Sequence, residues 1–333
     1  MTKLAPGLAI IVAETARRKH RLDRVYIRNP EIDRALERID ELRRSGFRGP
    51  DGLAFCALVV GPTNTGKTRL FRKYCDRPDA QPDGDRIPVL RFTAPSPFND
   101  RDFLAKMLLK LGTRDFAESH RPGRMKRRVV DMLAARQTEL ILIEETQHII
   151  DKKGGNSPYW AADMIKECIL DDAKVPIVFN GINVTKDIFT RNTQLLSRRK
   201  GVFHLEPDDW ANPLEREQFR AAVNVFECAA DFPEKATVGS GKLPLDSEAV
   251  AERIWRATGG LRGSLYTLFA QATELGVARG DLSLSVELLS EANAILSDGG
   301  PGWINMFTVK VLPPINVIDE SRVTKLVKRG RAT

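Results

Sequence analysis

Mostly apolar runs of four to six residues alternate with longer stretches in which apolar side chains recur at helical spacing over the first two thirds of the chain. The short runs are Phe55–Val60, Ile87–Phe92, Leu140–Ile143, Val175–Phe179 and Val202–Leu205. Such runs are typical of strands buried inside a sheet. Helical patterns cover residues 30–42, before the first run, and residues 69–75, 99–111 and 160–170 after it. Asn99 can cap the third of these helices, and a basic loop from Thr113 to Arg128 leads into another helix that ends near Arg136. The pattern therefore predicts strands and helices in alternation, the mark of an α/β fold.

The last third of the chain has helical periodicity only. Its helical segments are 212–230, 246–258, 263–278 and 285–296, separated by short polar or glycine-rich stretches. We interpret the chain as four parts: a basic N-terminal arm over the surface (1–28), a core of alternating strands and helices (29–210), a small all-helical domain (211–296), and a basic tail (297–333) that we expect to be extended and partner-binding.

The segment between the first strand and its following helix matches the P-loop pattern G-x-x-x-x-G-K-[ST]. The pattern allows backbone N–H groups to surround a polyphosphate, while the lysine binds the outer phosphates and the threonine hydroxyl holds Mg²⁺. A glycine-rich turn that binds nothing is the alternative, but the strand–loop–helix context favours ATP binding. The predicted ATP-binding residues are Gly61, Pro62, Thr63, Asn64, Thr65, Gly66, Lys67 and Thr68.

Polar side chains end two of the later strands. Glu144 and Glu145 follow the apolar run Leu140–Ile143. In a P-loop ATPase, one such carboxylate orients the magnesium shell and the next polarises the attacking water; two solvated acids at a strand end are the alternative. Asn180 ends the next strand and would lie beside the γ-phosphate if that strand lay between the other two. Otherwise it is a simple strand-ending residue.

Composition and charge narrow the partners. The 333 residues are 42% hydrophobic and 29% charged, with a net charge of +8 and a pI near 9.4. This balance favours an acidic polymer, nucleic acid first, as partner. Residues 101–130 carry nine Lys/Arg against three Asp/Glu, although a solvated helix face would show the same run.

The cysteine pattern and the apolar runs indicate the compartment. Four widely spaced cysteines suit reduced, buried thiols. No apolar run approaches the ~20 residues of a membrane span, and the N-terminus lacks a signal-peptide layout. We therefore expect a cytoplasmic protein with no membrane partner.

Several short motifs in order resemble the transposition-associated AAA+ ATPases of the TniB/TnsC type, over about residues 25–296. The segments that carry the resemblance are Arg28-Asn29-Pro30, Gly61–Thr68, Glu144–His148, Ser197-Arg198-Arg199, Trp210 with Pro213-Leu214-Glu215, Leu243-Pro244-Leu245 and Gly259–Gly263. The resemblance implies a five-stranded parallel sheet with flanking helices, followed by a helical lid. It also implies ATP-dependent assembly into rings or filaments on double-stranded DNA, recruitment of a transposase and an adaptor protein, and disassembly on hydrolysis.

The resemblance also implies roles for individual residues. Lys67 and Thr68 bind phosphate and Mg²⁺, Glu145 is the water-activating base, and Asn180 is the first sensor. Arg198 and Arg199 compete for the arginine finger that reaches a neighbour's γ-phosphate, with a solvated basic helix end as the alternative. Two positions depart from the family pattern. Glu144 stands where Asp is usual as a metal residue, and Arg262, which is either a second sensor that binds ATP or a surface charge, replaces a common aliphatic residue.

The basic segment within residues 101–130 is the predicted DNA-facing surface, on its local charge and on the resemblance. Because Phe103 and Phe116 are the only aromatic residues among these charges, we expect contacts to duplex phosphates rather than stacking on single-stranded bases. The candidate DNA-binding residues are Lys106, Lys110, Thr113, Arg114, Arg121, Arg124 and Lys126.

Two other classes of protein fit parts of the pattern. A replication initiator or helicase loader would also be a basic AAA+ ATPase, but would often carry a winged-helix domain after the lid, and we expect none after residue 296. A signalling ATPase of the nucleotide-binding oligomerisation type would append a long repeat domain. Binding to DNA only in the presence of ATP would argue against the signalling reading.

Overall fold

The computed structural model describes residues 6–27, 29–44, 52–113, 122–150, 158–186, 193–235, 244–297 and 303–313. The chain divides into two compact units. One comprises residues 28–205, and the other combines residues 1–27 with residues 206–333.

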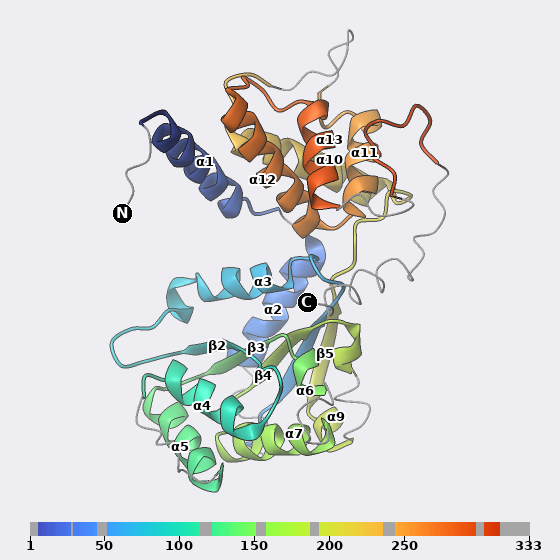
Figure 1. The fold of residues 1–333 in the computed structure, drawn as a ribbon. Helices are drawn as coiled ribbons and strands as arrows, with labels where there is room; N and C mark the ends of the chain where they lie inside the picture. Colours follow the sequence, from blue (N-terminus) through green and yellow to red (C-terminus); the bar gives the residue numbers. More distant parts are fainter. Residues whose placement is uncertain are drawn as a thin grey trace. The chain divides into compact units, whose positions relative to one another are not determined.

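The first unit is built on a parallel sheet of five strands in the order β2-β3-β4-β1-β5 (Figure 1). The strands are β1 (Cys56–Val60), β2 (Val89–Thr93), β3 (Leu140–Glu144), β4 (Ile177–Gly181) and β5 (Arg199–His204). β1, β3 and β4 are buried along their whole length, as their apolar sequences predicted. The expected five-stranded parallel sheet is confirmed.

Helices cover both faces of this sheet. α2 and α3 lie on one face, and α4, α5 and α7 lie on the other (Figure 1). The described helices of the unit are α2 (Pro30–Arg44), α3 (Lys67–Cys75), η2 (Pro78–Ala80), α4 (Asp100–Lys110), α5 (Pro122–Ala135), α6 (Gln147–Ile150), α7 (Pro158–Ile165), the π-helix η4 (Lys166–Asp172), η5 (Asn183–Lys186) and α9 (Thr193–Ser197).

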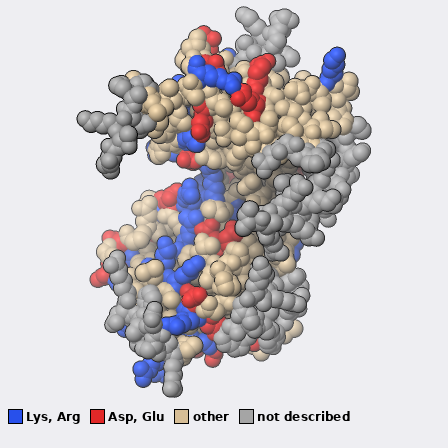
Figure 2. Space-filling model, viewed as in Figure 1, with Lys and Arg blue, Asp and Glu red and all other residues tan. Residues whose placement is uncertain are grey.

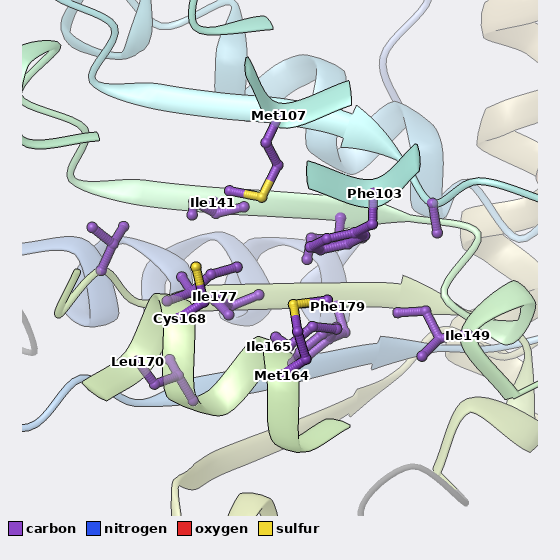
Figure 3. Close-up of a cluster of buried hydrophobic side chains, with 14 of the residues drawn as sticks. Phe103, Met107, Ile141, Ile149, Met164, Ile165, Cys168, Leu170, Ile177 and Phe179 are labelled. Atoms are coloured by element: carbon purple, nitrogen blue, oxygen red, sulfur yellow. The ribbon is translucent and has the colours of Figure 1, made fainter. Parts of the chain in front are cut away.

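The core of the unit lies between the sheet and the helices that cover its second face, α4, α5 and α7. Side chains from α4, α7 and η4 meet those of the central strands β3 and β4 (Figure 3). Phe103 of α4 is fully buried and packs edge-on against Phe92 of β2, with the ring centroids 5.3 Å apart. Asn99 caps α4 as predicted: its side chain accepts a hydrogen bond from the backbone N–H of Asp102. This packing fixes the sheet from which the strand-end residues project.

Two predicted boundaries differ from the structure. The expected loop from Thr113 to Arg128 is wrong over its second part, because α5 already begins at Pro122. Proline is favoured at the first helical position, where its missing N–H costs nothing, and the basic residues that follow do not oppose a helix. β5 begins at Arg199 rather than Val202. These shifts move Arg124 and Lys126 onto a helix and Arg199 onto a strand.

The regular elements described in the second unit are all helices. The unit contains α1 (Pro6–Arg24), α10 (Pro213–Ala230), α11 (Glu248–Thr258), α12 (Arg262–Arg279) and α13 (Val286–Leu296). Its core includes Trp210, Phe219, Trp255 and Phe269. None of the described helices in either unit is long and apolar enough to cross a membrane.

The N-terminal segment belongs to this helical unit. Residues 1–28 were expected to form an arm over the surface, but residues 6–24 form α1, which packs on α10 and α12. Leu22 is fully buried there, and Arg17 and Arg21 form ion pairs with Asp231. The arm interpretation is wrong because it read the basic cluster as a surface for a partner, whereas several of these charges pair with acids of the same unit.

The described part of the tail also contacts the helical unit. Two arginines of α11 donate hydrogen bonds to its main-chain carbonyls: Arg253 to Met306 (2.6 Å) and Val309 (2.9 Å), and Arg256 to Pro313 (2.7 Å). Residues 303–313 therefore follow the surface of the unit. The basic end of the tail lies outside the described residues.

The four cysteines are free thiols with different exposure. Cys56 and Cys168 are buried, Cys75 is partly buried, and Cys228 is exposed. The expectation of buried thiols is therefore wrong for Cys228, which lies on α10.

Candidate functional site

The P-loop connects the carboxyl end of β1 to the first residue of α3. A Cβ atom at Gly61 would lie 2.1 Å from the carbonyl oxygen of Leu205, so only glycine fits there. Gly66 has φ +97° and Asn64 has φ +68°, both in the left-handed region. The sequence thus folds into the strand–loop–helix context that the motif requires.

The charge of Lys67 lies inside this loop. Its side chain is buried, and its Nζ donates to the carbonyl oxygens of Gly61 (2.9 Å) and Pro62 (2.6 Å). Gly66 caps α3 without a side-chain hydrogen bond to the first turn. An ammonium group and a helix N-terminus that no side chain caps together suit a polyphosphate.

The two acidic residues at the end of β3 have different surroundings. Glu144 is buried, and its Oε1 accepts a hydrogen bond of 2.6 Å from Nε of Arg91 on β2. Glu145 has φ +54°, an uncommon value for a residue with a side chain, and its carboxylate accepts a hydrogen bond from the side chain of Gln147. Glu144 is therefore held on the sheet by Arg91, whereas Glu145 lies just beyond the end of β3.

Asn180 lies on β4, between the strand that leads to the P-loop and the strand that carries the acids. It is buried, and its carbonyl oxygen accepts from both the backbone N–H (3.0 Å) and the hydroxyl (2.8 Å) of Thr146. The strand order on which its proposed sensor position depended is confirmed. Parallel strands bring all three carboxyl ends to one edge of the sheet.

The oxygen atoms at this edge suit a magnesium ion. Thr68 is exposed in the first turn of α3, which follows β1, and Glu144 is the last residue of β3, which β4 separates from β1. Hydroxyl and carboxylate oxygens are the ligands that Mg²⁺ prefers. The residues therefore fit a metal bound together with phosphate.

Arg198 and Arg199 lie at the amino ends of the strands, opposite the carboxyl ends from which the P-loop and the acidic residues project. Arg199 pairs in register with Cys56, the first residue of β1, whereas the P-loop follows the last. Five strand residues span about 13 Å, which is beyond the reach of an arginine side chain. Arg198 Nη2 also donates to Asp171 Oδ1 at 2.8 Å. Neither arginine can therefore contact nucleotide bound to its own P-loop.

The family model described as "Bacterial TniB protein" matches residues 18–207, more than half of the 333 residues. This chain belongs to the TniB family. The matched region includes the P-loop, both strand-end acids, Asn180 and the arginine pair. No curated protein sequence matches the chain at significance.

Solved structures that resemble the TniB-family chain have AAA+ folds. They include ORC1 of Aeropyrum pernix in complex with DNA (TM-score 0.62, 18% identity, 84% of this chain and 69% of that chain). ORC2 of the same organism, in ADPNP–ADP complexes, gives a TM-score of 0.60 at 17% identity over 82% and 71% of the chains. Drosophila ORC bound to DNA gives 0.57 at 14% identity over 85% and 66%. At these identities the likeness shows the fold, a P-loop AAA+ ATPase.

Arg262 of the TniB-family chain forms a buried ion pair. Its Nε and Nη2 donate to the two carboxylate oxygens of Asp208 at 3.0 and 2.8 Å, and the two side chains are 10% and 5% exposed. Burial raises the pKa of Asp208, and the Arg262 guanidinium opposes that rise. The same segment is fixed by Trp255, whose Nε1 donates to the Asp208 carbonyl. The surface-charge alternative for Arg262 is therefore wrong, and the second-sensor role stays a prediction.

Arg262→Ala should lower the free energy of unfolding by about 3 kcal/mol, because it leaves the Asp208 carboxylate buried and unpaired. Urea denaturation checks this, with Arg279→Ala as the control. Arg279 lies on the same helix, but its ion pair with Glu291 is exposed, so we expect a loss below about 1 kcal/mol. If Arg262→Ala instead weakened ATP binding at unchanged stability, the sensor role would hold.

The structure separates the candidate DNA-binding residues into groups. Lys106, Lys110 and Arg124 are exposed, on α4 and α5. Lys126 forms an ion pair of 2.8 Å with Glu167. Thr113 is 8% exposed, which argues against a contact between its hydroxyl and phosphate. Arg114 and Arg121 lie outside the described residues. Figure 2 shows Lys and Arg side chains, with some acids among them, on the side of the sheet unit that is turned to the viewer.

Sequence reasoning missed four residues around these sites. Arg91 and Gln147 hold the two strand-end carboxylates. Arg127 and Arg128 are exposed one turn after Arg124 on α5. Their spacing of three and four from Arg124 was a usable signal once Pro122 was taken as the helix start. No sequence signal identifies the partner of Glu144, because the contact depends on strand order.

Proposed function

We propose that this TniB-family protein is an ATP-dependent DNA-binding regulator of transposition. In this proposal it assembles with ATP on duplex target DNA, recruits a transposase and an adaptor protein, and disassembles on hydrolysis. The observation that carries the proposal is the TniB match, because it spans the elements that form the candidate ATP site. The likeness to origin recognition proteins concerns the fold alone and does not favour replication initiation.

The proposed nucleotide chemistry assigns one role to each strand-end residue. Lys67 moves its ammonium group from the loop carbonyls to the outer phosphates, and the N–H groups of the loop bind around them. Thr68 and Glu144 hold Mg²⁺, which neutralises phosphate charge when bound. Glu145 takes a proton from the attacking water, and Asn180 positions that water or the γ-phosphate.

In this proposal Arg199, rather than Arg198, acts on nucleotide bound to a neighbouring copy of the protein. Arg198 is tied to Asp171 and its Nη1 is buried, so its guanidinium is part of the packing of its own unit. Arg199 lies on the edge strand β5. We assign it the arginine finger that stabilises charge on a neighbouring copy's γ-phosphate. ATP hydrolysis would then require assembly.

The proposed DNA-facing surface is the exposed side of α4 and α5. Lys106 and Lys110 are four residues apart and share one face of α4. Arg124, Arg127 and Arg128 add charge on α5, which packs beside α4. A row of exposed cations binds phosphates and does not read bases.

The triple variant Lys106→Ala, Lys110→Ala, Arg124→Ala should weaken duplex binding and leave ATP affinity unchanged. If each side chain contacts one phosphate, the slope of log affinity against log salt should fall by about 3. Fluorescence anisotropy of labelled duplexes across salt concentrations measures both effects, and duplexes of different base composition should give similar values.

The control variant removes charge elsewhere on the same unit. Arg34 and Arg38 lie on α2 and form ion pairs with Glu31 and Glu41. Their replacement by alanine should change DNA binding little. Equal weakening by both variants would mean that only net charge matters, and an unchanged salt slope in the triple variant would place the DNA surface elsewhere.

A further inference from the structure

The guanidinium of Arg91 donates a hydrogen bond to one oxygen of Glu144, the carboxylate that is proposed to hold Mg²⁺. Arg91 lies on β2 opposite Leu142, and Glu144 lies two residues further along β3, opposite Thr93. Side chains two residues apart on a strand share a face, so Arg91 reaches diagonally to Glu144. The two atoms are 2.6 Å apart, and the side chains are 26% and 8% exposed. This is a partly buried, charge-assisted contact.

The pair also lies close to the P-loop helix. Burial raises the pKa of Cys75, on α3, to about 11; the charge of Arg91 lowers it, and those of Asp76 and Glu144 raise it. These charges act on a thiol of the helix whose first turn contains Thr68. Cys75 is the last residue of α3, about 10 Å along the helix from Thr68. Arg91 therefore acts on a cation held by Thr68 and Glu144 through its 2.6 Å contact with Glu144.

We propose that Arg91 is a resident counter-cation of Glu144 that sets how much Mg²⁺ the nucleotide site needs. The inference rests on the proposed function. Without metal, Arg91 compensates a carboxylate that would otherwise be buried and unpaired. With metal, guanidinium and Mg²⁺ repel each other and share one ligand, so the site binds Mg²⁺ more weakly than it would without Arg91. Arg91 is thus a positioning residue that acts through Glu144.

The test compares wild type with Arg91→Met by titrating a fluorescent ATP analogue at increasing Mg²⁺, with an EDTA baseline. The Mg²⁺ concentration at half-maximal enhancement of nucleotide affinity should be about tenfold lower in the variant, because a positive charge near the metal is gone. The control is Arg86→Met. Arg86 also pairs with a glutamate, Glu139, but just before β3 begins, at the opposite edge of the sheet. Its midpoint should equal that of wild type.

Suppose that wild type binds nucleotide in an Mg²⁺-dependent way. An Arg91→Met midpoint that is equal to that of wild type, or higher, would then overturn this inference and leave the proposed function standing. A wild type that binds no nucleotide at any Mg²⁺ concentration would overturn the proposed function as well. If Arg91→Met fails to fold, Glu144→Gln in the same chain should restore folding by removing the unpaired charge. No restoration would show that the pairing with Glu144 is not what Arg91 does.

Discussion

Lys67→Ala should lower the affinity for ATP by about 100-fold or more, and should abolish every assembly that depends on ATP. Charge-assisted hydrogen bonds contribute roughly 1.5–3 kcal/mol each, and the loop carbonyls that now accept from Lys67 cannot themselves bind phosphate. Isothermal titration calorimetry with ATP measures the loss. Lys73→Ala, on the same helix but two turns further on, is the matched control and should bind ATP normally. Wild-type affinity in Lys67→Ala would place the nucleotide site elsewhere.

Arg199→Ala should lower ATP turnover by about 1,000-fold, the lower range for arginine fingers, while leaving ATP affinity unchanged. Because Arg199 lies at the opposite sheet edge from its own P-loop, its effect must act on a neighbouring copy. Mixing Arg199→Ala with Lys67→Ala should therefore restore part of the activity, since some interfaces pair an intact P-loop with an intact finger. Steady-state ATPase assays over mixing ratios measure the rescue.

Arg198→Ala provides the comparison for this experiment. Arg198 is paired with Asp171 within its own unit, so we expect reduced stability rather than a specific loss of turnover. No rescue at any ratio, with both variants shown to co-assemble, would argue against sites shared between copies. Loss of turnover in Arg198→Ala at full stability would transfer the finger role to Arg198.

The sequence predicted those parts of the molecule that depend on a motif or a pattern within one short stretch of the chain. The P-loop has a fixed pattern of glycines, lysine and threonine, so β1, the loop and α3 follow from it. β3 with its two acids follows from an apolar run that ends in charge, and Asn99 follows from capping chemistry. Asn180 needed one further fact, the order of the strands, which the sequence suggested only through the family resemblance.

Several of the predictions that failed concern charges whose partners are distant in the chain. Arg17 and Arg21 were read as a basic arm, but Asp231 lies more than 200 residues away in sequence and pairs with both. One alternative for Arg262 was a charge on the surface, but Arg262 forms a buried ion pair with Asp208. Arg91 was not singled out, because only the pairing of β2 with β3 brings it to Glu144. Sequence alone gives the sign of a charge and not its partner.

Electron microscopy of the wild-type protein tests the proposed ATP-dependent assembly on DNA most directly. The protein should be imaged with a non-hydrolysable ATP analogue, with and without duplex DNA, and with duplex DNA but no nucleotide. We predict rings or helical filaments around the duplex when both analogue and DNA are present, and none on DNA without nucleotide. Dispersed single copies in all of these conditions, or equal assembly on DNA without nucleotide, would contradict the account.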